Sequence, residues 1–168
     1  LEIGSWCGRS TIWLAQGAKL AGTVVIALDH HRGSEEHQPG EMFFDADLVD
    51  GDGRVDTLRE FRRNIAQAGV EDTVIPIVAG TQQANAILPH TLGMVFIDGG
   101  HSLEAALTDW RSVGHRVLPG GILAIHDVFP DARTGGQAPF TIWRLAIDSG
   151  LYEACDAVDS LRALRRLA

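Results

Sequence analysis

Two apolar runs in the second half of the chain end in groups that could do chemistry. The run MVFI is followed by Asp98, with His101 three residues further on, and the run ILAI is followed by His126 and Asp127. Such groups are costly to bury unless they are paired, bound to a metal or used in a reaction. Two carboxylates can hold one divalent cation that acidifies a hydroxyl, and an imidazole nearby is a suitable base for the proton. The four residues therefore form a candidate site for metal-assisted chemistry.

Each of these residues also has a purely structural explanation. Asp98 could cap the helix that follows it, His101 could lie on that helix's surface, and His126 with Asp127 could form a solvated turn. Any one of these explanations is reasonable alone. The occurrence of all four residues at the ends of neighbouring strands, however, favours a functional site.

A second candidate site opens the chain. Gly4 and Gly8 lie in the turn of EIGSWCGRS, where they allow positive φ angles and close approach of a nucleotide-like ligand. Their Gly-x-x-x-Gly spacing differs from the Gly-x-Gly-x-x-Gly of dinucleotide-binding folds. Asp29 follows the next apolar run, where a carboxylate can bind both ribose hydroxyls. The alternative is a tight turn and a capped strand, which the combination of glycines and Asp29 makes less favourable.

The elements that would position these residues alternate along the chain. Apolar, β-branched runs predict strands, and segments with helical periodicity predict helices between them. The expected strands are 1–3, 24–28, 74–78, 94–97, 122–125, 152–158 and 161–167. The expected helices are 10–19, 57–68, 83–88, 103–117 and 139–149. This pattern predicts a doubly wound, Rossmann-like α/β sheet, mostly parallel, with a C-terminal antiparallel hairpin and helices on both faces.

Length and composition set limits on the class of protein. The 168 residues, 45% of them hydrophobic, predict one domain spanning 1–168, and the start inside a strand, without Met, predicts a missing natural N-terminal segment. The net charge of −8 disfavours binding to nucleic acids or anionic membranes, and no apolar stretch reaches the roughly 20 residues of a membrane span. Cys7 and Cys155 form no disulfide framework, which favours a reducing cytoplasm.

The segment EIGSWCGRS resembles motif I of the class I S-adenosylmethionine-dependent methyltransferases, in particular the metal-dependent catechol O-methyltransferase branch. The resemblance continues through Asp29, residues 80–83, residues 94–98 and residues 120–128, and so spans nearly the whole chain. The stretches around Asp98-Gly-Gly-His101 and His126-Asp127 are also similar to bacterial methyltransferases that act on macrolide sugars.

The resemblance implies a role for each matching residue. The amino-acid end of S-adenosylmethionine would be held by Glu2, Gly4, Ser5 and Gly8. Its ribose and adenine would be bordered by Asp29, Gly80, Thr81 and Gln82, and the cofactor would also contact Asp98.

The resemblance also implies a divalent metal. Asp98 and Asp127 would be its ligands together with His126, and His101 would take the place of the catalytic base. His126 stands where an acid is usual, so the choice between Mg²⁺ and Mn²⁺ stays open, since an imidazole suits ions softer than Mg²⁺.

A long connection, residues 30–56, follows Asp29. Such loops at the active edge of an α/β fold are typically lids or substrate-binding elements. Arg32 within it is a candidate partner for an acidic substrate or for the carboxylate of the cofactor.

The expected function is methyl transfer from S-adenosylmethionine to a hydroxyl of a small molecule in the cytoplasm. The sequence identifies neither the acceptor nor the oligomeric state, although enzymes of the family it resembles often form a homodimer. Two alternatives stay open: a nicotinamide-dependent Rossmann oxidoreductase, and a non-catalytic cofactor-binding protein of the same fold.

Overall fold

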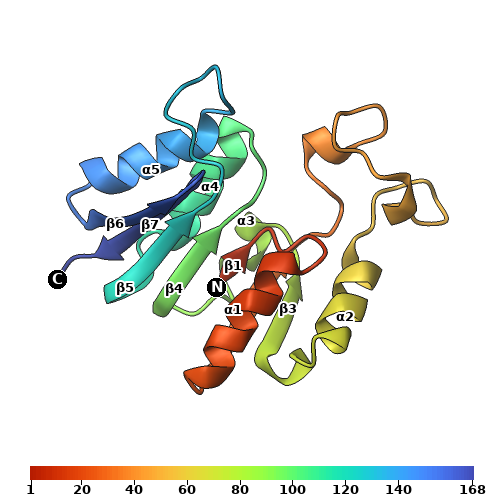
Figure 1. The fold of residues 1–168 in the computed structure, drawn as a ribbon, viewed down its shortest axis with the longest axis horizontal. Helices are drawn as coiled ribbons and strands as arrows, with labels where there is room; N and C mark the ends of the chain where they lie inside the picture. The colour runs from red at the N-terminus through yellow and green to blue at the C-terminus, as the bar shows by residue number, and fades with distance from the viewer. The chain divides into compact units, whose positions relative to one another are not determined.

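The computed structural model describes residues 1–168, which form two compact units (Figure 1). The N-terminal unit is Glu2–Gly80, and the C-terminal unit is Thr81–Ala168 together with Leu1. In chain order the N-terminal unit contains β1 (Glu2–Ile3), α1 (Arg9–Leu20), β2 (Val25–Asp29), η1 (Glu35–His37), η2 (Ala46–Leu48), α2 (Leu58–Gln67), η3 (Glu71–Thr73) and β3 (Val74–Val78). The C-terminal unit contains α3 (Thr81–Ala84), β4 (Leu92–Ile97), α4 (Leu103–Val113), β5 (Val117–Ile125), α5 (Ala138–Asp148), β6 (Tyr152–Val158) and β7 (Leu161–Arg166).

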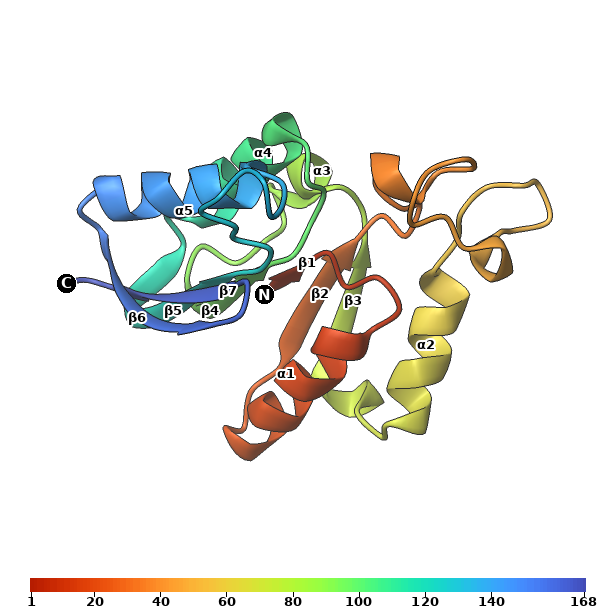
Figure 2. The ribbon, with the colours of Figure 1, turned by 45° about the horizontal axis from the view of Figure 1, so that its top comes forward.

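The N-terminal unit is a parallel sheet with the strand order β3-β2-β1. Ile3 pairs with Leu28, and Asp29 pairs with Val78, so that β2 and β3 end side by side. Helices α1 and α2 lie along this sheet (Figure 2). The turn after β1 and the carboxyl end of β2 are thereby brought to one edge of the unit.

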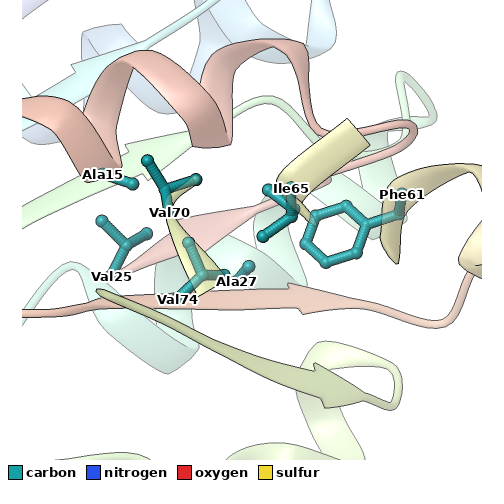
Figure 3. Packing of buried hydrophobic residues seen from close by; sticks show 7 residues of the cluster. All are labelled: Ala15, Val25, Ala27, Phe61, Ile65, Val70 and Val74. Atoms are coloured by element: carbon teal, nitrogen blue, oxygen red, sulfur yellow. The ribbon is translucent and has the colours of Figure 1, made fainter. Parts of the chain in front are cut away.

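Helix α2 is anchored to this sheet by residues one helical turn apart. Phe61 and Ile65 are buried together with Ala15 of α1, Val25 and Ala27 of β2, and Val70 and Val74 (Figure 3). Replacing a buried aromatic residue such as Phe61 by Ala typically costs about 3–5 kcal/mol. This core fixes the ends of α1 and β2 that carry the candidate residues.

The C-terminal unit has the strand order β4-β5-β7-β6. Strands β4 and β5 are parallel, whereas β7 is antiparallel to both β5 and β6, as expected for a closing hairpin. Helix α5 contacts both α4 and β6. Ile97 pairs with Ile125, so the residues that follow β4 and β5 emerge next to each other.

Three elements differ by more than two residues at one end from those that the sequence predicts. Pro119-Gly120-Gly121 lies inside β5 as an irregularity rather than before it, because Gly120 has φ 80° and the backbone of Gly121 lies against the carbonyl of Gly93. Helix α4 ends at Val113 rather than Val117, where the guanidinium of Arg116 caps the carbonyl of Ser112. Helix α3 is shorter and begins earlier than the predicted helix 83–88.

The predicted fold class is confirmed: the chain has a Rossmann-like α/β fold, mostly parallel, with a C-terminal antiparallel hairpin. None of its helices is both long and apolar enough to cross a membrane.

Candidate functional site

The turn between β1 and α1 depends on two glycines with left-handed backbone angles. Gly4 has φ 84°, and Gly8 has φ 89° and precedes the first residue of α1. A Cβ at Gly8 would lie 3.2 Å from Cδ2 of Phe61, so a side chain there would be both strained and crowded. The turn therefore presents main-chain groups rather than side chains at the start of α1.

Two predicted cofactor residues in this segment are buried. The carboxylate of Glu2 accepts a hydrogen bond from the hydroxyl of Thr11 in α1, which ties β1 to that helix. The Oγ of Ser5 is buried and has no hydrogen-bond partner among the described residues. Because buried hydroxyls are normally satisfied, the Oγ of Ser5 is suited to meet a polar group of a ligand.

Asp29 is held from both sides by main-chain donors. Its Oδ2 accepts a hydrogen bond from the N–H of Trp6, and its Oδ1 accepts one from the N–H of His31, both at 2.7 Å. Trp6 and His31 have φ angles of 47° and 57°, which are uncommon for residues other than glycine. Each carboxylate oxygen can accept more than one hydrogen bond, so Asp29 is oriented and can still bind hydroxyl groups of a ribose.

His31 is a buried residue whose role the sequence did not indicate. Its Nδ1 lies 2.8 Å from Oγ1 of Thr57, and its carbonyl accepts a hydrogen bond from the N–H of Thr57. Burial lowers the pKa of His31, which favours the neutral imidazole. The pair closes the base of the connection that runs from β2 to α2.

Arg32 is engaged inside the same connection. Its guanidinium donates to Asp50 Oδ2 at 2.8 Å and to the carbonyl of Val55 at 3.2 Å. The rings of His37 and Trp6 lie 4.2 Å apart, so this connection also packs against the turn that precedes α1. The structure thus uses Arg32 to shape the loop, and no acidic ligand is needed to explain its position.

The start of α3 carries the residues predicted to border adenine. The hydroxyl of Thr81 is bonded to the carboxyl group of Asp109, and both residues are buried. Burial raises the pKa of Asp109 to about 6, although the hydrogen bond from Thr81 lowers it. Thr81 is therefore directed toward α4, whereas Gln82 next to it is exposed.

The structure brings together all four residues that follow β4 and β5. Nε2 of His101 lies 3.1 Å from Oδ2 of Asp127, and Nδ1 of His126 lies 3.2 Å from Oδ1 of Asp98 and 3.1 Å from Oδ1 of Asp127. Asp98, His101 and Asp127 each offer a potential metal ligand, and these ligand atoms lie within 4.8 Å of one another. We call these four residues the Asp/His cluster.

The two carboxylates of the Asp/His cluster have opposite pKa shifts. Burial raises the pKa of Asp98, and the negative charge of Asp127 raises it further, although His126 opposes both effects. The hydrogen bond from His101 lowers the pKa of Asp127, whose backbone has φ 55°. Two close carboxylates, one of them poorly solvated, favour a bound cation, and strained backbone is frequent at functional sites.

Ser160 is a further residue at this cluster that sequence reasoning missed. Its hydroxyl donates to Oδ1 of Asp127 at 3.2 Å, and its carbonyl accepts from the N–H of Val128. Ser160 lies in the turn between β6 and β7, and no local pattern relates that turn to Asp127. A small depression that is open to solvent adjoins the cluster. Its walls include Asp98, His101, His126, Ala106, Pro139 and Ile142.

Comparison with known proteins gives one family and a group of solved structures. A family model described as a methyltransferase domain matches residues 1–128. The O-methyltransferase NovP has a TM-score of 0.73 at 16% sequence identity, covering 99% of this chain and 71% of NovP. An O-methyltransferase from Bacillus cereus in complex with SAH has a TM-score of 0.62 at 22% identity, covering 98% of this chain and 72% of that one. TomG from Streptomyces achromogenes, involved in tomaymycin synthesis and solved with SAM, has a TM-score of 0.61 at 16% identity, covering 99% of this chain and 72% of TomG.

Proposed function

The chain belongs to the family of methyltransferase domains, and we propose that it transfers the methyl group of S-adenosylmethionine to a hydroxyl of a small molecule. In this proposal Asp98 and Asp127 hold a divalent metal, and His101 is the general base. The observation that carries the proposal is the Asp/His cluster, in which oxygens of Asp98 and Asp127 lie within 4.8 Å of one another and of a ring nitrogen of His101. Family membership gives the nicotinamide-dependent alternative no support.

The donor set of the cluster fits a divalent cation. A cation would offset the unfavourable burial of Asp98 next to Asp127, and carboxylates together with imidazoles are common ligands of first-row divalent transition metals. When bound, such an ion supplies Lewis acidity that lowers the pKa of an acceptor hydroxyl. S-adenosylmethionine supplies an electrophilic methyl group on a sulfonium.

His101 would move the proton of the acceptor. With Nε2 donating to Oδ2 of Asp127, the nitrogen that accepts the hydroxyl proton is Nδ1. Asp127 then stabilises the imidazolium, as a carboxylate does behind a catalytic histidine. The acceptor oxygen forms its bond to the methyl carbon while the carbon–sulfur bond breaks, and the electron pair of that bond stays on sulfur in S-adenosylhomocysteine.

The residues of the N-terminal unit would bind the donor. Asp29, oriented by two main-chain N–H groups, is placed to accept from the ribose hydroxyls, and the buried Oγ of Ser5 is suited to a polar group of the amino-acid end. Gly4 and Gly8 allow close approach of the main chain. From the C-terminal unit, Gln82 at the exposed start of α3 is the proposed neighbour of adenine.

The experiment is a methyl-transfer assay with labelled S-adenosylmethionine and a panel of sugars, phenols and other hydroxyl compounds. We expect product with at least one acceptor, loss of turnover after chelation, and recovery when a divalent ion is added. The substitution Asp148→Asn on the exposed side of α5 is a control that removes a carboxylate outside the cluster. Turnover that survives chelation, with metal content confirmed as negligible, would contradict the metal's role. Binding of S-adenosylhomocysteine without turnover of any acceptor would favour the non-catalytic alternative.

A further inference from the structure

His126 occupies an unusual position in the Asp/His cluster. Its Nδ1 lies 3.2 Å from a carboxylate oxygen of Asp98 and 3.1 Å from one of Asp127, yet this buried atom has no hydrogen-bond partner. The nitrogen therefore lies between two carboxylate oxygens that would also bind a cation.

The surroundings of His126 hold the imidazole in this position. The main-chain N–H of His126 donates to the carbonyl of Ile97 at 3.0 Å, which fixes the main chain beside the end of β4. The ring of Phe96 meets the imidazole edge-on, with the ring centres 6.3 Å apart. Leaving a polar atom unsatisfied and buried has a cost, which a ligand at that atom would remove.

We propose that Nδ1 of His126 is a ligand of the metal, and that this nitrogen makes the site select a first-row transition-metal ion such as Mn²⁺, Fe²⁺, Co²⁺ or Zn²⁺ over Mg²⁺. The inference rests on the proposed metal site of Asp98 and Asp127. Mg²⁺ is a hard ion that prefers oxygen ligands, whereas imidazole suits the later divalent ions. A site with two carboxylates and one imidazole nitrogen therefore disfavours Mg²⁺ relative to a site made of carboxylates alone.

The two histidines of the cluster then have different tasks. Nε2 of His101 donates to Oδ2 of Asp127 and so belongs to the proton-transfer pair. Nδ1 of His126 lies between the carboxylate oxygens that would also bind the ion. Replacing His126 should change which metal is bound, whereas replacing His101 should impair removal of the proton from the acceptor hydroxyl.

The test is pulsed electron paramagnetic resonance of the protein loaded with Mn²⁺, which detects a directly bound ¹⁴N nucleus, combined with competition by Mg²⁺. We expect a ¹⁴N coupling in the wild type and in His101→Asn, and its loss in His126→Asp and His126→Asn. In His126→Asp the preference for Mn²⁺ over Mg²⁺ should fall by roughly 10-fold or more. His115→Ala, which removes an exposed histidine of the same unit, is the matched control.

The outcomes separate this inference from the proposed function. A wild type that binds Mn²⁺ without a ¹⁴N coupling overturns the role of His126 but leaves the metal site intact. A ¹⁴N coupling that survives both His126 substitutions and disappears in His101→Asn assigns the ligand to His101 and also overturns the inference. A wild type that binds no divalent ion contradicts the proposed metal-assisted mechanism itself. Circular dichroism and S-adenosylhomocysteine binding of each variant confirm that the comparison is made between folded proteins.

Discussion

In the N-terminal unit, the carboxylate at the end of β2 is held by the main chain: Asp29 accepts from the N–H groups of Trp6 and His31 at 2.7 Å each. In the C-terminal unit, the side chains that follow β4 and β5 are held largely by one another, with ion-pair distances of 3.1 to 3.2 Å. A carboxylate fixed by main-chain donors keeps its orientation when a nearby side chain is replaced. In a cluster whose side chains hold one another, replacing one side chain changes the position and protonation of several others at once.

We expect this difference to separate the residues that set cofactor affinity from those that set the reaction rate. A rigid, main-chain-oriented carboxylate is suited to binding the same ligand atoms throughout a reaction, which sets cofactor affinity without favouring the transition state. The Asp/His cluster combines two carboxylates whose pKa values are shifted in opposite directions, which is typical of groups that handle charge during catalysis. We therefore expect substitutions in the two units to have effects of different kinds.

The largest effect is expected from Asp127→Asn. The substitution removes a proposed metal ligand, the partner of His101 and a neighbour of His126 in one step. Turnover should fall by more than about 10⁴-fold, beyond the usual cost of losing a general base alone. Steady-state methyl transfer gives the rate, and calorimetry should show S-adenosylhomocysteine affinity within about threefold of wild type. If S-adenosylhomocysteine affinity fell as much as the rate, cofactor binding and catalysis would not be separated between the two units.

A smaller effect on rate is expected from His101→Ala. Removing the base should lower kcat by about 10²–10³, since a metal that already acidifies the hydroxyl softens the loss. The wild-type rate should rise with pH as the imidazole loses its proton, and that limb should be absent or displaced in the variant. Unchanged turnover and an unchanged pH profile would show that His101 is a surface residue at the start of α4 and that the metal alone activates the hydroxyl.

Asp29→Ala should act on binding and not on chemistry. The loss of hydrogen bonds to the ribose should weaken S-adenosylhomocysteine binding by about 1–3 kcal/mol, or roughly 5- to 150-fold. Calorimetry provides the affinity, and Asp72→Ala, at an exposed position of η3, is the control. If Mn²⁺ affinity fell as much as nucleotide affinity, Asp29 would have to act on the metal site as well.

The smallest effect is expected on stability, at the buried Asp109. Its folded pKa of about 6 lies above the value of about 4 for an unfolded Asp, so this group favours the folded state at low pH, and that stability is lost as the pH rises from about 4 to about 6. Asp109→Asn should remove this dependence, so that the substitution is more favourable at pH 7.5 than at pH 4 by about 2 kcal/mol. Urea unfolding at the two pH values measures the change. An equal effect of the substitution at both pH values would show that Asp109 is charged in the folded protein over the whole range.

The fold class and the Asp/His cluster could be predicted because their signals are local. An apolar run that breaks into Asp98 or into His126-Asp127 marks the carboxyl end of a buried strand, and the match of the first 128 residues to a methyltransferase domain agrees with the resemblance carried by motif I. The roles of the individual residues, the metal, the small-molecule acceptor, the homodimer, the single domain and the cytoplasmic location stay predictions.

Other features could not be predicted because they depend on residues distant in sequence. The contact of His31 with Thr57 spans the whole connection between β2 and α2, and Ser160 reaches Asp127 only because β7 pairs with β5. Pro119-Gly120-Gly121 resembles a turn, yet Gly120 and Gly121 accommodate an irregularity within β5. Thr81 is directed to Asp109, which lies on a helix that no local pattern relates to it.

The most direct test of the central claim is a calorimetric titration of S-adenosylhomocysteine into the wild-type protein, with and without a chelator. The account predicts one nucleotide bound per chain in both samples, with affinities that agree within about threefold, because the donor is held by the N-terminal unit and the metal by the Asp/His cluster. No binding in either sample would contradict the proposed donor, and binding only in the presence of metal would contradict the separation of affinity from rate.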